Sequence, residues 1–308
     1  MLKTIFRLIY WLGLQKRYQA VDRMRYLKRL SRGANPADNQ YFSRFDYKQF
    51  SYKEPVYIST HFRGQCVFFC CGSQQNLERK ILRQGFSGYP VLDYMADYVK
   101  PNTAVLDIGA NVGIYAIPLA VAFPDVTVHA FEPNSVAMKQ LSENSRLNNL
   151  KNLKVHSCAI SDCMGESNFY QFDDVTSLSS LNCDAAEIHG KPVTRKVKIE
   201  TVDHFLMDNA EQKVSFVKID VQGAELEVLC GARGVIGRDL PIILFEHEDK
   251  HFKTPELAQT KKNAIAELLG GLGYRTLYLT RYNHRLLFPV NWKQPLDGDV
   301  IALPMGKV

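Results

Sequence analysis

The pattern that most constrains the fold begins after Pro101, where short apolar runs alternate with stretches of helical periodicity. The runs are rich in Val, Ile and Phe, as strands buried on both faces are, and the stretches between them can form crossover helices. Strands that alternate with helices of this length are typical of βαβ units. The sequence therefore predicts an α/β fold with a Rossmann-like, mostly parallel sheet of seven strands.

Seven strands and four helices are expected in this region. The strands are placed at Ala104–Ile108, Val126–Glu132, Lys154–Ser161, Ser215–Asp220, Ile242–Glu246, 274–280 and 299–303, and the helices at 113–123, 134–148, 224–236 and 256–271. The segment from Cys163 to His204 is too long for a simple crossover, so we expect an extra hairpin and a mobile loop there. Thr176 to Ser180 stand at the centre of the expected lid.

Three segments are predicted along the chain: a basic amphipathic segment (1–35), an accessory linker and hairpin region (36–89), and the α/β domain (90–308). Residues 33–55 show no sustained period. From Val56 to Cys71, β-branched and aromatic residues form two runs separated by Arg63, Gly64 and Gln65, which indicates a hairpin. The domain is therefore preceded by a helical and β-hairpin extension.

The net charge of +6 is concentrated at the N-terminus. Residues 1–32 hold nine Lys or Arg against one acid, a sum of +8, and the remaining 276 residues sum to −2. A near-neutral body does not resemble a nucleic-acid groove, and no nucleic-acid partner is expected for it. Apolar residues recur at helical spacing in the basic segment, at Leu2, Ile5, Phe6, Ile9 and Leu12.

This basic helix has three interpretations: peripheral contact with an anionic membrane, electrostatic binding of RNA, or packing on its own body or a partner subunit. Arg7 interrupts the apolar centre that a secretory signal would need. No apolar run reaches the roughly 18 residues of a spanning helix. Seven cysteines without a CxxC pair indicate free thiols in a reducing compartment. We therefore expect a cytoplasmic protein, with peripheral contact at the inner face of a membrane as an alternative.

A glycine turn follows the first strand of the α/β region. In DIGANVG at 107–113, the backbone of Gly109, Ala110, Asn111 and Gly113 can approach a ligand at the carboxyl edge of the sheet. The dinucleotide fingerprint GxGxxG would require Gly at position 111. Asp107 would repel a pyrophosphate but would suit a cationic amino group or a sulfonium. The turn therefore favours a nucleoside that bears a charged amino acid over NAD.

Acids also stand at the ends of the next two expected strands. Glu132 lies 19 residues beyond Gly113, where a carboxylate can accept both ribose hydroxyls of a nucleoside. Asp162 follows the third strand and could accept from an adenine amino group. The alternative for each is an exposed acid at a strand end. Together with the glycine turn, they predict a nucleoside site.

The fourth and fifth strands end in further polar groups. Lys218 and Asp220 share one face of a buried strand, which indicates either a structural ion pair or a functional site. Glu246 and His247 end the neighbouring strand, so we expect these four residues to border one site, with His247 or Asp220 as general base. Asp220 and Glu246 could alternatively hold a divalent metal. HEDKH at 247–251 fits the zinc-protease pattern HExxH, but that pattern requires a helix and this run follows a strand.

These motifs resemble, in order and spacing, the FkbM-like methyltransferases, a family of class I S-adenosylmethionine-dependent enzymes. The resemblance covers residues 90–303 and rests on DIGANVG at 107–113, FEPN at 131–134, AISD at 159–162, ETVDHFL at 200–206, KIDVQGAE at 218–225 and IILFEHE at 242–248. The chain departs from the family at position 222, which is Gln where Glu is usual. An argument that uses a carboxylate at 222 therefore does not apply.

The resemblance implies the class I methyltransferase fold, S-adenosylmethionine as cofactor and O-methylation of a hydroxyl on a sugar, glycan or natural product. It does not select among these acceptors, and the sequence does not give an oligomeric state. Three other functions are considered: an NAD-dependent oxidoreductase, which Asn111 and Asp107 disfavour; a non-catalytic nucleoside-binding scaffold with a decayed site; and a nucleic-acid methyltransferase, whose Asn/Asp-Pro-Pro-aromatic motif is lacking after the fourth strand.

Overall fold

The computed structural model describes residues 56–71, 90–173, 175–207, 212–279 and 287–306. The chain divides into two compact units, residues 1–90 and 91–308, and each is described by itself. The expectations for the basic amphipathic segment and for residues 33–55 lie outside the described residues. No helix within the described ranges combines the length and the apolar character that crossing a membrane requires.

The described part of the first unit is a β-hairpin. Strand β1 (Val56–Phe62) pairs antiparallel with β2 (Gln65–Cys71). Arg63 (φ 46°) and Gly64 (φ 79°) form the two-residue connection, and positive φ at both positions matches the right-handed twist of a hairpin. The predicted hairpin is confirmed.

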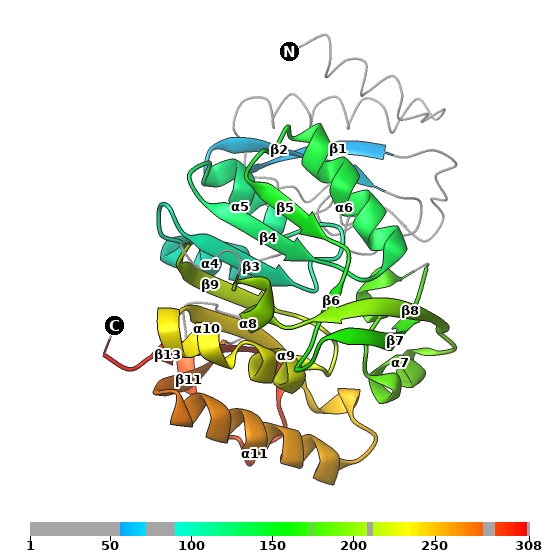
Figure 1. Ribbon diagram of the computed structural model, residues 1–308, viewed down its shortest axis with the longest axis vertical. Helices are drawn as coiled ribbons and strands as arrows, with labels where there is room; N and C mark the ends of the chain where they lie inside the picture. Colours follow the sequence, from blue (N-terminus) through cyan, green and yellow to red (C-terminus); the bar gives the residue numbers. More distant parts are fainter. Residues whose placement is uncertain (1–55, 72–89, 174, 208–211, 280–286, 307–308) are drawn as a thin grey trace, which may run out of the picture. The chain divides into compact units, whose positions relative to one another are not determined.

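The second unit is built on one eight-stranded sheet (Figure 1). Its strands are β3 (Ala104–Ile108), β4 (Thr127–Phe131), β5 (Leu153–His156), β9 (Val214–Ile219), β10 (Ile242–Glu248), β11 (Tyr274–Leu279), β12 (Leu287–Pro289) and β13 (Asp297–Pro304). The spatial order is β12-β11-β13-β10-β9-β3-β4-β5. The five strands from β10 to β5 are parallel to one another, whereas the pairs β10–β13, β13–β11 and β11–β12 are antiparallel. The predicted architecture is confirmed, with β12 as an additional eighth strand at the edge.

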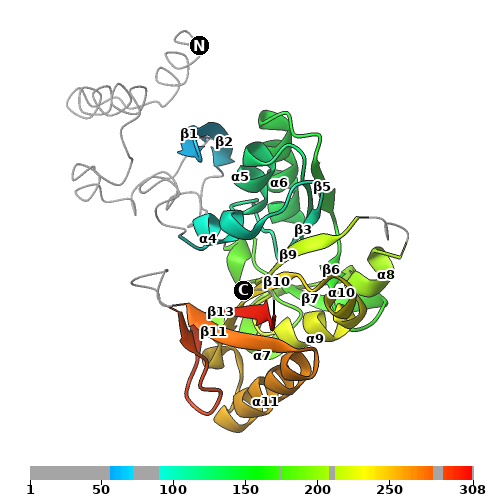
Figure 2. The same ribbon diagram turned by 90° about the vertical axis from the view of Figure 1, so that its left-hand side faces the viewer.

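Helices connect these strands and pack on the sheet (Figures 1 and 2). They are α4 (Pro90–Tyr98), α5 (Ala116–Ala122), α6 (Ser135–Leu147), α7 (Cys183–His189), α8 (Val202–Phe205), α9 (Glu225–Gly231), α10 (Arg233–Asp239) and α11 (Pro255–Gly271). The chain runs from β3 outward to β4 and β5, then returns to β9 and runs outward to β10. The order therefore reverses between β3 and β9, and ligands of open α/β sheets bind outside the carboxyl ends of the strands at such a point.

Two elements that the sequence predicted as continuous are each divided in the structure. The expected strand at 154–161 is two strands, β5 and β6 (Ala159–Ile160), and β6 belongs to a second, three-stranded sheet of order β6-β8-β7. The expected helix at 224–236 is divided at Ala232 into α9 and α10. The extra hairpin is confirmed, because β7 (Gly165–Gln171) pairs antiparallel with β8 (Val193–Glu200).

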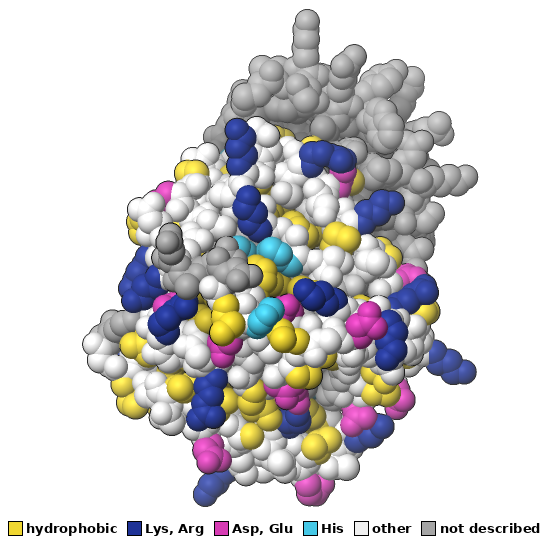
Figure 3. Space-filling view, viewed as in Figure 1, with side chains coloured by type: hydrophobic (Ala, Val, Ile, Leu, Met, Phe, Trp, Pro, Cys, Tyr) yellow, Lys and Arg dark blue, Asp and Glu magenta, His cyan; other side chains and the backbone are white. Residues whose placement is uncertain are grey.

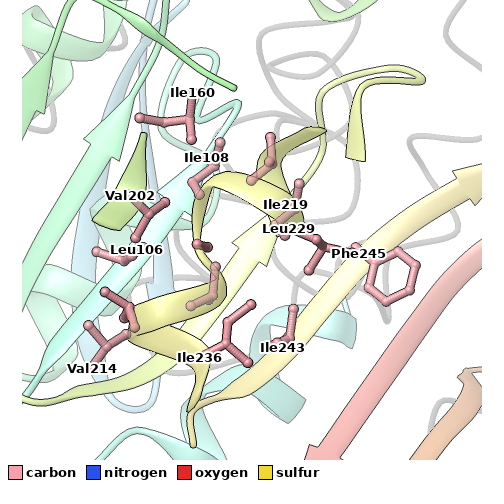
Figure 4. Close-up of a cluster of buried hydrophobic side chains, with 14 of the residues drawn as sticks. Leu106, Ile108, Ile160, Val202, Val214, Ile219, Leu229, Ile236, Ile243 and Phe245 are labelled. Carbon is pink, nitrogen blue, oxygen red and sulfur yellow. The ribbon is translucent and has the colours of Figure 1, made fainter. Parts of the chain in front are cut away.

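One face of the main sheet carries a continuous apolar core (Figure 4). Alternate strand residues such as Leu106, Ile219 and Phe245 point to this face and are buried against α8 to α11. The intervening residues point to the opposite face. This alternation places Asp107 and Lys218 on the face away from that core, where they lie among the functional candidates described next.

Candidate functional site

The turn between β3 and α5 passes so close to the end of β9 that only glycine fits at position 109. A Cβ on Gly109 (φ 79°) would lie 1.8 Å from the backbone oxygen of Asp220. The amides of Gly109 and Ala110 both donate to the carbonyl of Phe131, at 3.0 Å, which ties the turn to the end of β4. The turn is therefore fixed between the carboxyl ends of β4 and β9.

Glu132 joins the glycine turn to the end of β4. Its Oε2 accepts from the backbone amide of Asn111 and its Oε1 accepts from that of Asn134, both at 2.7 Å. The side chain is buried, and burial raises the pKa of Glu132 to about 7 although both amides oppose the shift. The structure therefore places this carboxylate beside the turn, as predicted, and sequence reasoning missed its bond to Asn111.

Lys218 is buried between two carboxylates. Its Nζ lies 3.4 Å from Oδ1 of Asp107 and 3.4 Å from Oδ2 of Asp220, and 4.6 Å from the ring centroid of Tyr115. Burial lowers the pKa of Lys218, but these carboxylates more than offset that effect, so the pKa is raised. Asp107 is completely buried and also accepts from the amide of Ala116 at 3.1 Å. The structure shows the contact of Lys218 with Asp220 that the strand pattern indicated, and adds a contact with Asp107 across β3 and β9 that the sequence did not predict.

Gln222 continues this row of polar groups to β10. Its Nε2 lies 2.9 Å from Oδ1 of Asp220 and 3.0 Å from Oε2 of Glu246. Burial raises the pKa of Glu246 to about 9, with further contributions from the Asp220 and Glu248 carboxylates. Asp107, Lys218, Asp220, Gln222 and Glu246 therefore form one continuous row across the ends of β3, β9 and β10.

His247 does not lie with these groups. It follows Glu246 on β10, and successive strand residues point to opposite faces, so His247 lies on the face of Phe245. Its ring is 1% exposed and stacks on Phe252 with a centroid distance of 5.6 Å. Burial lowers the pKa of His247 to about 4. The expectation that it borders the same site as Asp220 and Glu246 is corrected by this alternation.

The HExxH run lies on β10 and the 3-10 turn η6 (Asp249–His251), not on a helix, as the sequence indicated. Glu248 and His251 are 3.2 Å apart, and both are buried. Within the described ranges, no three or more His, Cys, Asp or Glu side chains are arranged to hold a metal ion. The pattern is therefore part of the packing between β10 and η6.

Residues 172–173 and 175–182, here the crossing segment, connect three strand ends by side-chain hydrogen bonds. Thr176 Oγ1 lies 2.9 Å from Oδ1 of Asn111, and Asn134 Nδ2 donates to Ser179 Oγ at 2.9 Å. Ser180 Oγ lies 2.8 Å from the carbonyl oxygen of Gln222. The segment expected as a lid thus contacts the turns after β3, β4 and β9, and none of these partners could be read from the sequence.

A family comparison identifies the chain. The sequence model of the methyltransferase FkbM domain matches residues 107–276, more than half of the 308 residues. The chain belongs to the FkbM methyltransferase family. The matched range begins at Asp107 and contains the whole polar row, so the site described above lies inside the family domain.

Three curated relatives share part of this sequence. Methyltransferase 1 of Beauveria bassiana is 25% identical over 42% of this chain and 58% of its own length. The 31-O-demethyl-FK506 methyltransferase FkbM of Streptomyces tacrolimicus is 29% identical over 43% of this chain and 60% of its own length. The 2-O-methyltransferase NoeI of Sinorhizobium fredii is 25% identical over 55% and 72%. The chain thus spans about three fifths of the first two relatives.

Two solved structures are also similar to part of this chain. The crystal structure of methyltransferase FkbM from Methylobacillus flagellatus has a TM-score of 0.43 and 16% identity, over 68% of this chain and 50% of that chain. The structure of TYW2 from M. jannaschii in complex with AdoMet has a TM-score of 0.39 and 14% identity, over 82% and 86%. The fold of this FkbM-family chain is an open, mostly parallel α/β sheet, as the strand order and the switch point between β3 and β9 show.

Asp162 is the one predicted cofactor residue that the structure places away from the main sheet. It follows β6 in the small sheet and is exposed. A Cβ on Gly231 of α9 would lie 2.0 Å from the backbone oxygen of Ser161, so this turn packs tightly on α9. The contact with an adenine amino group stays a prediction for this FkbM-family chain.

Proposed function

We propose that this protein transfers a methyl group from S-adenosylmethionine to a hydroxyl of a small molecule or glycan. The observation that carries the proposal is the polar row from Asp107 to Glu246, which begins at the glycine turn and ends on β10 in a chain of the FkbM family. The names of two relatives specify transfer to oxygen, which supports a hydroxyl acceptor.

The glycine turn and Glu132 fit the nucleoside of this cofactor. The backbone from Gly109 to Gly113 lacks a Cβ at both ends, and Glu132 supplies two carboxylate oxygens at the start of α6. Each oxygen accepts one backbone amide and retains a second lone pair for a ribose hydroxyl. Asp107 was expected to face the charged group of the cofactor. Because it is completely buried and pairs with Lys218, whose Nζ lies 3.5 Å from the carbonyl oxygen of Gly109, we assign it instead to holding the turn.

When bound, S-adenosylmethionine supplies an activated methyl group on a sulfonium. The chain then has to align the acceptor, exclude water and remove the hydroxyl proton. Lys218 is cationic, Glu246 holds its proton at neutral pH because its pKa is about 9, and His247 lies on the other face. Asp220, whose side chain is 33% exposed, remains as the base that accepts the proton.

One face of the molecule favours a small acceptor over a nucleic acid. Basic and acidic side chains are both spread over the face shown in Figure 3, and no continuous basic stripe marks a path for a nucleic acid. Contact of the basic residues 1–32 with a membrane, and a cytoplasmic location, stay predictions.

The cofactor itself provides the first test. Saturating S-adenosylmethionine, at about a hundred times Kd, stabilises a protein by roughly 2.7 kcal/mol, which we expect to raise the Tm by about 5–10 °C. Thermal unfolding of the full chain is measured with this ligand and, separately, with NAD. A shift with NAD alone would establish the oxidoreductase alternative. No shift with either ligand would favour the scaffold with a decayed site.

The pH dependence of cofactor affinity tests the role of Glu132. The ionised carboxylate accepts two hydroxyls, and the pKa of Glu132 is raised to about 7, so the group becomes protonated as pH falls through 7. We expect the Kd measured by titration calorimetry to be about tenfold weaker at pH 6 than at pH 8. Glu132→Gln should weaken binding at pH 8 and remove most of this pH dependence.

Glu166→Gln is the matched control for this experiment, because Glu166 is exposed on β7. It should retain both the affinity and the pH dependence of the unsubstituted protein. Protonation of the ligand itself affects the Kd of both variants equally, so it does not contribute to the difference between them. Identical pH profiles for Glu132→Gln and Glu166→Gln would remove Glu132 from the ribose site.

A further inference from the structure

One amide nitrogen joins two carboxylates at the carboxyl edge of the sheet. Nε2 of Gln222 lies 2.9 Å from Oδ1 of Asp220 and 3.0 Å from Oε2 of Glu246. A side-chain amide has two N–H groups, so the nitrogen can donate to both oxygens at once, whereas its own oxygen could donate to neither. Gln222 therefore connects the end of β9 to β10.

The backbone around Gln222 is built to present this side chain. Gln222 has φ 55°, a conformation that costs an L-residue about 1 kcal/mol or more, so neighbouring contacts must hold it. Its carbonyl oxygen lies 2.8 Å from Ser180 Oγ of the crossing segment. Glu225 Oε1 accepts from the amides of Val221 and Gly223, at 3.4 and 3.0 Å. The contacts on both sides of position 222 therefore fix the position of the amide.

Two carboxyl groups at short range do not ionise together readily, and the nearby Asp220 carboxylate is one reason why the pKa of Glu246 is raised. A cation or a hydrogen-bond donor between them is needed to hold the two groups side by side. Lys218 lies 3.4 Å from Asp220, but among the described residues no Lys, Arg or His lies within ion-pair distance of Glu246. Proteins often bridge such carboxylates with a divalent cation bound by their oxygens. The Nε2 atom of Gln222 occupies the corresponding position between the two groups.

We propose that Gln222 is a positioning residue whose amide takes the place of a divalent cation between Asp220 and Glu246, so that the acceptor side of the site works without a metal. The assignment of these groups to the acceptor side rests on the proposed function. The position of the Gln222 amide between Asp220 and Glu246 does not depend on methyl transfer, and both experiments below test it without an acceptor or a cofactor.

Metal binding is the first experiment. Gln222→Glu replaces the donor by a third carboxylate beside Asp220 and Glu246, and three such oxygen ligands suit Mn²⁺. Titration calorimetry with Mn²⁺ alone should show at least tenfold tighter binding to Gln222→Glu than to the unsubstituted full chain. Adding Glu246→Gln to this variant should remove the gain.

Two results would overturn the proposal. The unsubstituted chain could bind Mn²⁺ as tightly as Gln222→Glu and lose that binding in Asp220→Asn, which would mean that the two carboxylates hold a metal beside the amide. Alternatively, Gln222→Glu could fold and gain no affinity, which would mean that the carboxylates are not held together.

A double-mutant cycle tests the same contact should Gln222→Glu fail to fold. Gln222→Met keeps the length of the side chain and removes both donors, so we expect the Tm to fall by roughly 3–6 °C. In a Glu246→Gln background the loss should be less than half as large, because one carboxylate no longer needs a donor. Equal losses in both backgrounds would show that Gln222 only fills space, and would overturn the proposal. The shift with S-adenosylmethionine separately decides the proposed function.

Discussion

Lys218→Met is expected to lower the free energy of unfolding by about 3–5 kcal/mol at pH 7.5. The substitution keeps a long apolar side chain but removes the ammonium group that lies 3.4 Å from both Asp107 and Asp220. Asp107 is completely buried, so its carboxylate would lose its cation without gaining water. Chemical denaturation of the full chain, followed by circular dichroism, measures the loss.

The pH dependence of this loss distinguishes an unpaired carboxylate from a packing defect. Burial already raises the pKa of Asp107 above the model-peptide value of 3.8, although Lys218 opposes the shift. An acid whose pKa is higher in the folded than in the unfolded state favours folding at low pH, and this stability is lost as pH rises above the unfolded pKa. Removing Lys218 raises the folded pKa further, so the deficit of Lys218→Met should shrink between pH 7.5 and pH 5.5.

Lys253→Met provides the control for the ion pair. Lys253 lies 2.7 Å from Asp184, but its side chain is 57% exposed, and exposed pairs contribute little because water solvates both charges. No measurable change in stability is expected from this substitution. A deficit of Lys218→Met that is constant across pH, or no larger than that of Lys253→Met, would contradict the role assigned to the buried pair.

The parts of the fold that sequence reasoning predicted are those that local pattern determines. The buried strands around DIGANVG at 107–113 and KIDVQGAE at 218–225 are apolar runs followed by glycine turns, and both lie where the sequence placed them. Lys218 could be predicted as a paired residue because a charge inside such a run requires a partner. The pattern of apolar runs and glycine turns was therefore enough to predict the positions of these strands and the polar residues at their ends.

The wrong predictions concern positions whose placement depends on a one-residue shift in strand register or on a contact between residues far apart in the sequence. His247 was grouped with Glu246 although adjacent strand residues face opposite sides of a sheet. The strand expected at 154–161 leaves the main sheet because β6 pairs with β8, more than 30 residues along the chain, and no local signal shows that pairing. Asp162 was placed at the edge of the main sheet for the same reason.

The donors that complete the site were also invisible in the sequence. Gln222 appeared only as a missing carboxylate, and its bond to Glu246 joins residues 24 positions apart. The crossing segment was recognised as a candidate lid by its length, but Thr176 meets Asn111 across 65 positions. Such contacts depend on the topology of the switch point between β3 and β9, which a linear pattern does not encode.

The second large effect is expected from Gly109→Ala. The new Cβ would lie 1.8 Å from the backbone oxygen of Asp220, far inside any allowed contact, and that oxygen belongs to backbone that cannot rotate away. The amide of Asp220 donates to the carbonyl of Ile108 at 2.9 Å, so moving Asp220 also strains the pairing of β3 with β9. We expect a loss of at least about 4 kcal/mol in unfolding free energy. Affinity for S-adenosylmethionine should fall at least about 100-fold, since the turn and Asp220 must both shift.

Gly273→Ala separates the steric clash from the cost of the backbone conformation. Gly273 has φ 78° against 79° for Gly109, and a Cβ there would meet no atom within 4 Å. Its substitution should therefore cost only the roughly 1–2 kcal/mol of placing an L-residue at positive φ. Denaturation and calorimetry on the two variants, side by side, measure the difference. Equal losses of stability, or unchanged cofactor affinity in Gly109→Ala, would mean that the close approach of the glycine turn to the end of β9 does not shape the site.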